Sequence, residues 1–174
     1  RCGKNTMAQN KYGFTNVASL TAEAIGTPGT RTFRISAASG SSSATVWIEK
    51  EQLFQLSLAM KQLQSSLATN STPSPPSSLE APPLTKLDLT PNKIVLSYSE
   101  SAACFIIEIS ETQGQQSTTL KLWVSEKLVK DFSTQAMQVC YAGRPLCQLC
   151  GSPMDSSGHR CPMVNGHSTE THIP

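Results

Sequence analysis

No run of apolar residues in this chain approaches the roughly 18 residues that a membrane-spanning helix requires. Charge of one sign is also lacking, because 14 Lys and Arg stand against 12 Asp and Glu, for a formal net charge of +2. Nucleic acids and acidic membrane surfaces are usually bound through a strong basic excess. The sequence therefore argues against both nucleic acid and membranes as partners.

The N-terminal residues lack the apolar segment of a secretory signal. We expect Met7 to be the natural start, with residues 1–6 either an expression remnant or an upstream extension. Without an export signal the expected compartment is the cytoplasm, where closely spaced cysteines more often hold metal than form disulfides. Cys104 and Cys140 stand alone in apolar surroundings, so we predict that both are small core residues.

Enzyme signatures are missing as well: the chain has no G-x-S-x-G, no Walker loop, no H-E-x-x-H and no G-x-G-x-x-G. All three histidines follow residue 158, so a histidine acid or base would have to come from the C-terminal tail.

Glu108 alternates with isoleucines, which favours a solvent-facing carboxylate over one lining a pocket. Arg31 and Arg34 follow a "GTPGT" turn, where a charged edge strand is favoured over an anion site.

The first half of the chain predicts three strands followed by a helix. The strands are expected at residues 16–24, 31–37 and 44–50. The helix, "EQLFQLSLAMKQLQSSL", has apolar residues at steps of three and four, which line one face. These residues are Leu53, Leu56, Met60, Leu63 and Leu67.

The second half predicts the same order, with strands at 92–100, 104–110 and 117–125 and a helix that begins after Ser125 as N-cap. Many residues of this half lie the same number of positions after a similar residue in the first half, and we call this difference in residue number the shift. Such a recurrence indicates an internal duplication. The pairs are Leu53 and Val129, Leu56 and Phe132, Met60 and Ala136, Leu63 and Val139, Trp47 and Trp123, Ile48 and Val124, Asn16 and Asn92, and Leu20 and Leu96. We expect the two tryptophans to be core residues beneath the helices rather than a platform for stacking bases.

The fold class that follows is α+β, with two βββα repeats packed as one domain and a short zinc-knuckle tail behind them. Residues 1–13 are predicted to be a flexible N-terminal extension. The repeats occupy 14–68 and 85–143, and residues 69–84, which include five prolines, form an extended linker. The tail comprises residues 144–174.

The tail concentrates metal-ligating side chains in a segment with few apolar residues. Ordering some 30 residues costs roughly 1–2 kcal/mol each in backbone entropy, which so few apolar side chains cannot offset. A tetrahedral zinc ion supplies on the order of 10 kcal/mol in small modules. The predicted ligands are Cys147 and Cys150, in C-x-x-C spacing, with His159 and Cys161; His167 is the alternative fourth ligand.

Other uses of a C-x-x-C pair fit the tail less well. A redox pair normally begins a helix in a βαβ unit, whereas Gly, Pro and Ser surround this one. Haem attachment requires a histidine directly after the second cysteine, and that residue is Gly151. A zinc ion with four protein ligands is closed and structural, so no catalytic role is predicted for it.

The tail "AGRPLCQLCGSPMDSSGHRCP" and the following "NG", together with the early "GTPGTRTF", resemble a family of uncharacterised bacterial proteins, a domain of unknown function. The resemblance extends from about Phe14 to Gly166. Family members usually have a basic residue where this chain has Met163, and often an aromatic residue in place of His167. The second difference implies that His159 is the ligand. The family has no established activity, so the resemblance implies a fold and a zinc site without a function.

Two functional hypotheses follow. The favoured one is a non-enzymatic protein-binding or adaptor module with a structural zinc site. The alternative is a small-molecule enzyme or ligand sensor with a pocket at the seam between the two repeats. A deep cleft with Glu108 or Arg34 pointing into it would support the alternative, whereas a filled seam would support the first.

Overall fold

The computed structural model describes residues 8–27, 29–67, 84–142, 147–150, 154, 159–161 and 163. The chain divides into a unit of residues 1–140 and a second unit of residues 141–174, and each is described here on its own. Of the predicted linker, Leu84 alone belongs to the described residues. Among the helices of the described part, none is both long and apolar enough to span a membrane.

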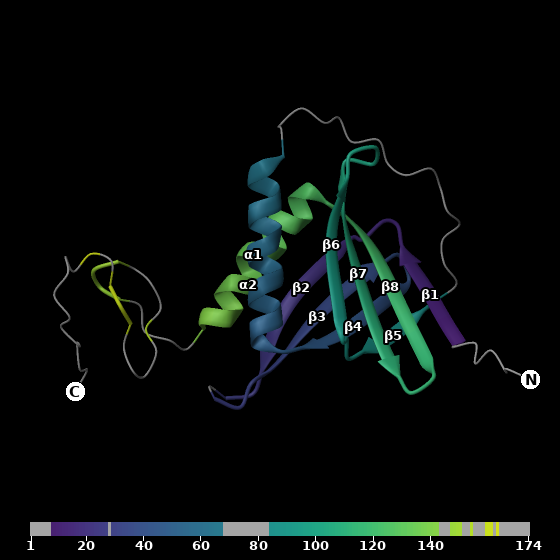
Figure 1. The fold of residues 1–174 in the computed structure, drawn as a ribbon, viewed down its shortest axis with the longest axis horizontal. Coiled ribbons are helices and arrows are strands. Elements are labelled where there is room, and N and C mark those ends of the chain that lie inside the picture. The colour runs from purple at the N-terminus through teal and green to yellow at the C-terminus, as the bar shows by residue number, and fades with distance from the viewer. Residues whose placement is uncertain are drawn as a thin grey trace, which may run out of the picture. The chain divides into compact units, whose positions relative to one another are not determined.

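All six predicted strands and both predicted helices are present in the first unit (Figure 1). One further strand, which the sequence did not predict, precedes each set of three. In chain order the elements are β1 (Ala8–Phe14), β2 (Ser19–Ile25), β3 (Thr32–Ser39), β4 (Ser42–Ile48), α1 (Lys50–Ser66), β5 (Lys86–Leu89), β6 (Lys93–Ser99), β7 (Cys104–Gln113), β8 (Gln116–Ser125) and α2 (Glu126–Tyr141).

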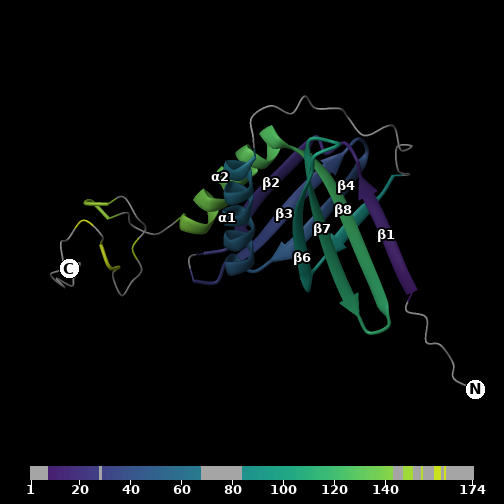
Figure 2. The same ribbon diagram turned by 45° about the horizontal axis from the view of Figure 1, so that its top comes forward.

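The strands form two four-stranded mixed sheets, ordered β1-β8-β7-β6 and β2-β3-β4-β5. Within each sheet the three strands of one repeat are antiparallel, and the fourth strand is parallel to its neighbour. The two helices lie next to each other at one side of the sheets (Figures 1 and 2). This arrangement confirms the predicted α+β class.

Local sequence explains where the helices begin. The backbone N–H of Leu128 donates to Ser125 Oγ at 3.3 Å, which confirms the predicted N-cap of α2. Before α1, the Gln52 side chain accepts a hydrogen bond from the Glu49 backbone N–H at 3.1 Å, as in one half of a capping box. The first turn of each helix is thus held by a polar side chain at its start.

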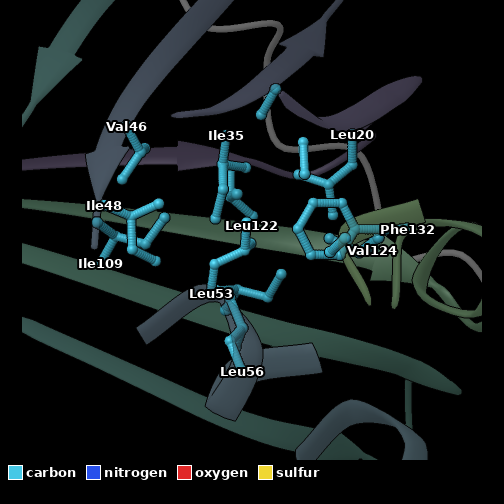
Figure 3. Packing of buried hydrophobic residues seen from close by; sticks show 14 of the residues in the cluster. Leu20, Ile35, Val46, Ile48, Leu53, Leu56, Ile109, Leu122, Val124 and Phe132 are labelled. Carbon is cyan, nitrogen blue, oxygen red and sulfur yellow. The ribbon is translucent and has the colours of Figure 1, made fainter. Parts of the chain in front are cut away.

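The core is one continuous cluster that both sheets and both helices contribute to. Alternate residues of β3 and β4 point inward, with Ile35 and Val46 as examples, and face Leu122 of the other sheet (Figure 3). Leu53 from α1 and Phe132 from α2 enter the same cluster. The predicted helix stripes are confirmed, since their members are buried or packed against the core: Leu53, Leu56, Met60, Leu63, Leu67, Val129, Phe132, Ala136 and Val139.

The first of the two additional strands, β1, corrects the expected N-terminal extension. Residues 8–13 belong to it, and its last residue, Phe14, is fully buried opposite Leu122 of β8. In the other sheet, Leu89 of β5 is buried opposite Val46 of β4. Val46 and Leu122 are related by the same shift as the paired helix residues, so the two fourth strands occupy equivalent places. The repeat is therefore βββαβ, and the N-terminal strand supplies the last member of the second copy.

The shift that relates β4 and α1 to β8 and α2 does not hold for the other strands. Phe33 pairs with Ile48, and Phe105 pairs with Val124, the counterpart of Ile48. Phe105 is therefore the counterpart of Phe33, and these two residues are fewer positions apart than Ile48 and Val124 are. By the same pairing Leu20 corresponds to Ile94 and not to Leu96, as the sequence had suggested. The reason is that β7 and β8 are longer than β3 and β4 around their hairpin.

The tryptophans are not core residues, contrary to the sequence-based expectation. Both lie on the outer faces of their sheets, where each flanks the parallel fourth strand. Trp47 Nε1 donates to Asp88 Oδ1 of β5 at 2.9 Å. At the equivalent place in β1 stands Gly13, and a Cβ atom added there would lie 3.2 Å from Cζ3 of Trp123. One tryptophan thus holds its neighbouring strand by a hydrogen bond and the other by close contact.

This contact yields a stability prediction. Gly13→Val is expected to lower the free energy of unfolding by about 1–3 kcal/mol, because a branched side chain would displace the Trp123 ring. Chemical denaturation followed by circular dichroism measures the change. In a Trp123→Ala background the same substitution should be neutral or stabilising, since valine favours a strand more than glycine does. Equal losses of unfolding free energy in both backgrounds would show that contact with Trp123 is not the reason why glycine is required at position 13.

Candidate metal centre

The second unit brings together the four residues that the sequence singled out. Cys147, Cys150, His159 and Cys161 each offer one ligand atom, and these atoms all lie within 4.8 Å of one another. The cluster could therefore hold a metal ion. His167, the alternative ligand, lies outside the described residues.

The distances within the cluster fit a tetrahedral ion. With metal–sulfur bonds of about 2.3 Å, two sulfur ligands of a tetrahedron lie roughly 3.8 Å apart. The Cys147 and Cys161 sulfur atoms are separated by 3.8 Å. Cys150 Sγ and His159 Nε2 are 3.1 Å apart, about 0.4 Å closer than a tetrahedral edge with one nitrogen would be. A small opening of this pair suffices to seat an ion.

The same distances exclude a disulfide between Cys147 and Cys161. A disulfide has a sulfur–sulfur distance of about 2.05 Å, far below the 3.8 Å observed. These two sulfur atoms are available as metal ligands once they are deprotonated.

Cys161 is the last of the four cluster residues in the chain. Desolvation raises the pKa of its thiol, and the adjacent Cys150 and Cys147 act in the same direction. A hydrogen bond from the backbone N–H of Met163 opposes them, because it favours the thiolate and so lowers the pKa. A divalent cation bound in the cluster would lower the pKa of this thiol, because it stabilises neighbouring thiolates.

The charged residues proposed for a pocket at the seam are placed elsewhere. Glu108 faces outward and forms an ion pair with Lys121 at 3.2 Å, so the solvent-facing prediction is confirmed. Arg34 forms an ion pair with Glu23 of β2 at 2.6 Å. The expectation of a charged edge strand was wrong in one respect: β3 lies between β2 and β4, and β2 is the edge.

Among the residues that the structure describes, the common core occupies the seam between the repeats. A shallow, solvent-open depression of about 370 Å³ lies between the two helices. Its lining is polar, consisting of Lys61, Gln64 and Ser65 from α1 and Glu126, Lys130, Ser133 and Thr134 from α2. Gln64 Nε2 bridges the helices by donating to the Glu126 carbonyl oxygen at 3.0 Å. Neither Glu108 nor Arg34 contributes to this depression.

Cys104 and Cys140 are buried, as predicted for core residues. Burial raises the pKa of the Cys104 thiol. In the unfolded chain this thiol ionises near its ordinary pKa of about 8.5, whereas the folded protein keeps it neutral to higher pH. The unfolded state then binds fewer protons, so the free energy of unfolding falls as pH rises through the unfolded pKa toward the folded one.

Cys104→Ala is therefore expected to flatten the decline of stability above about pH 8. Urea unfolding at several pH values between about 7 and 10, on wild type and variant, measures the two slopes. The remaining cysteines titrate in both proteins and cancel in the difference. Identical slopes would mean that Cys104 ionises equally in both states.

Taken together, the described residues define an α+β protein built from two pseudo-equivalent βββαβ sheets, with a Cys₃His cluster near the C-terminus. The chain belongs to the family described as "Protein of unknown function (DUF3090)", whose model matches residues 12–161. That match begins within β1 and ends at Cys161, the last residue of the cluster. Neither the curated proteins nor the solved structures contain a match to this chain.

Proposed function

We propose that this protein is a non-enzymatic protein-binding or adaptor module whose C-terminal residues fold around a structural zinc ion. The observation that carries the zinc part of the proposal is the cluster itself. Cys147, Cys150, His159 and Cys161 offer four ligand atoms within 4.8 Å of one another. Three sulfur ligands and one imidazole form a common set for structural zinc.

The donor set supports zinc over other ions. Thiolates and imidazole are soft or borderline ligands, whereas magnesium and calcium bind oxygen. If all four side chains bind, no coordination position is left for water or substrate. The ion would then stabilise the fold of the tail and take no part in a reaction.

The cytoplasm is the proposed compartment because the cluster requires reduced thiols. Cysteines remain reduced there, whereas an oxidising compartment would favour disulfides. The nearly balanced charge of the chain, with a formal net charge of +2, supports a protein partner over nucleic acid or a membrane surface.

The alternative function, a small-molecule enzyme or sensor, has the depression between α1 and α2 in its favour. That depression joins the two repeats and is lined by Lys61 and Lys130, which suit an anionic ligand. Its open, shallow form suits a small ligand poorly, because such ligands bind where most of their surface is buried. We therefore favour the protein-binding function.

Elemental mass spectrometry of protein purified without added metal tests the zinc site. One zinc per chain is expected, with the metal retained through gel filtration. Native mass spectrometry before and after a chelator serves as the control for weakly associated ions. Protein that lacks metal, or that carries a disulfide within the cluster under reducing conditions, would contradict the proposal.

A further inference from the structure

The internal duplication places the edge strands β2 and β6 at equivalent positions of the two sheets. Leu96 of β6 is the counterpart of Ala22 of β2, because strand pairing leads from these two residues to the counterparts Leu122 and Val46. Each edge also has a helix beside it, since α1 lies next to β6 and α2 contacts β2 (Figures 1 and 2). The closure of one edge can therefore be compared directly with that of the other.

The edge of β2 is closed by α2 at its centre. The backbone N–H of Ala22 points away from β3 and donates to Gln135 Oε1 of α2 at 3.1 Å. The inner side chains of this strand are covered as well, since Leu20 is 3% and Ala22 is 2% exposed. At this position the chain itself supplies both the hydrogen-bond acceptor and the apolar cover of the edge.

The backbone of β6 has the same hydrogen-bonding phase as that of β2. At the start of each edge strand, an equivalent backbone N–H donates to a carbonyl oxygen of the neighbouring strand, from Ala18 to Ala38 at 2.8 Å and from Asn92 to Ser110 at 3.0 Å. Successive residues of an antiparallel edge strand direct their N–H groups alternately toward the sheet and away from it. Since the Ala22 N–H points away from β3, the Leu96 N–H points away from β7.

The group that would close this second edge is missing from α1. The shift that relates the helices places Ala59 where α2 has Gln135, and a methyl group accepts no hydrogen bond. Among the residues that the structure describes, no side chain accepts a hydrogen bond from the Leu96 N–H. The inner side chains are also less covered than those of β2, because Ile94 and Leu96 are only half-buried.

A depression of about 380 Å³ lies at this open position. It is lined by four residues of α1 and one of β6, none of them charged: Ala59, Gln62, Leu63, Ser66 and Leu96. The leucines suit an apolar side chain. The depression is open to solvent, so a small molecule bound there would keep much of its surface in water. A ligand that is also held along the strand would not depend on the depression alone.

We propose that β6 binds an extended segment of a partner protein, which pairs with the strand through its backbone and places an apolar side chain in the depression. The Leu96 N–H needs a carbonyl oxygen, which Gln135 supplies to Ala22 in the other copy. An added strand supplies such oxygens at the spacing of successive outward N–H groups. Main-chain hydrogen bonds then give affinity, and the depression selects the apolar side chain. This inference rests on the proposed protein-binding function and is independent of the zinc ion.

Amide hydrogen exchange, measured by NMR on the full chain, tests whether the edge is open. The Leu96 amide is expected to exchange at least tenfold faster than the Ala22 amide. Ala59→Gln introduces the missing acceptor and should slow exchange at Leu96 at least tenfold. Ser65→Gln, at an exposed residue of the same helix outside the depression, is the matched control and should change neither rate. A Leu96 amide as protected as that of Ala22 in the wild type would overturn the proposal.

Random peptides of about twelve residues, longer than the seven residues of β6, provide the binding test when displayed on phage and selected against the full chain. Peptides with apolar residues at alternate positions are expected to be enriched. Their binding to the wild type should slow exchange at Leu96, a result that needs no variant. Their affinity should fall at least tenfold for Ala59→Gln and stay unchanged for Ser65→Gln.

The outcomes separate this site from the proposed function. Enriched peptides that ignore Ala59→Gln and leave exchange at Leu96 unchanged overturn the β6 site, while protein binding stands. A selection that enriches no peptide contradicts both the site and the protein-binding function. A wild-type dimer in analytical ultracentrifugation that Ala59→Gln dissociates would assign the edge to a second copy of this chain and overturn the partner segment.

Discussion

His159→Ala is expected to remove most of the zinc from the purified protein, whereas His167→Ala should leave one zinc per chain. His159 Nε2 lies 3.1 Å from the Cys150 sulfur, inside the group of four ligand atoms. Structural zinc in small modules contributes roughly 10–16 kcal/mol in total. Losing one ligand of four should therefore weaken binding by roughly 100-fold or more. Competition with a chromophoric zinc chelator measures the change in affinity.

The consequence for the tail can be followed separately. Without zinc, residues 144–174 have too few apolar side chains to offset the entropy of ordering the chain. Limited proteolysis should cut the tail of the His159→Ala variant at least tenfold faster than that of wild type, while His167→Ala resembles wild type. Loss of zinc only in His167→Ala would assign the fourth ligand to His167, and equal zinc content in the two variants would contradict the assignment to His159.

The second large effect is expected in the core of the first unit. Phe132→Ala should lower the free energy of unfolding by about 3–5 kcal/mol, because the ring is 1% exposed within the cluster shared by both sheets. For a protein of this size the loss corresponds to a decrease in Tm of roughly 6–20 °C. Urea denaturation followed by circular dichroism gives the free energy directly.

Gln138→Ala is the matched control on the same helix. Its side chain is exposed, so the change should stay within about 0.5 kcal/mol of wild type. A small effect at Phe132 would indicate that α2 does not close the core of the two sheets. A large effect at Gln138 would indicate that helix propensity, and not burial, dominates the stability of α2.

The candidate site was largely predictable because its signals are local. The C-x-x-C pair, the nearby His159 and the Cys161-Pro pair all fall in one short stretch of the chain that begins at Cys147. A short, polar segment with four soft ligands has few ways to fold other than around an ion. What the sequence could not supply was the exposure of Leu149 and Met163, because exposure depends on the neighbours that a side chain meets in space.

The sequence by itself determined the two helices and six of the eight strands, β2 to β4 and β6 to β8. Helical spacing of apolar residues and alternation along strands are properties of neighbouring positions, so Leu53, Phe132 and their stripes could be assigned to the core. The recurrence of these patterns at a constant shift also revealed the duplication.

Only the tertiary structure decided how the two copies complete each other. β1 and β5 carry weak local signals, and each is a strand because a distant partner, β8 or β4, supplies its hydrogen bonds. The tryptophans illustrate the same limit. Alternation places Trp47 and Trp123 on the opposite face of the strand from their neighbours, but only the packing of the two sheets decides that this face is the outer one. Strand pairing joins residues far apart in the chain, and its energy arises from contacts that no local pattern encodes.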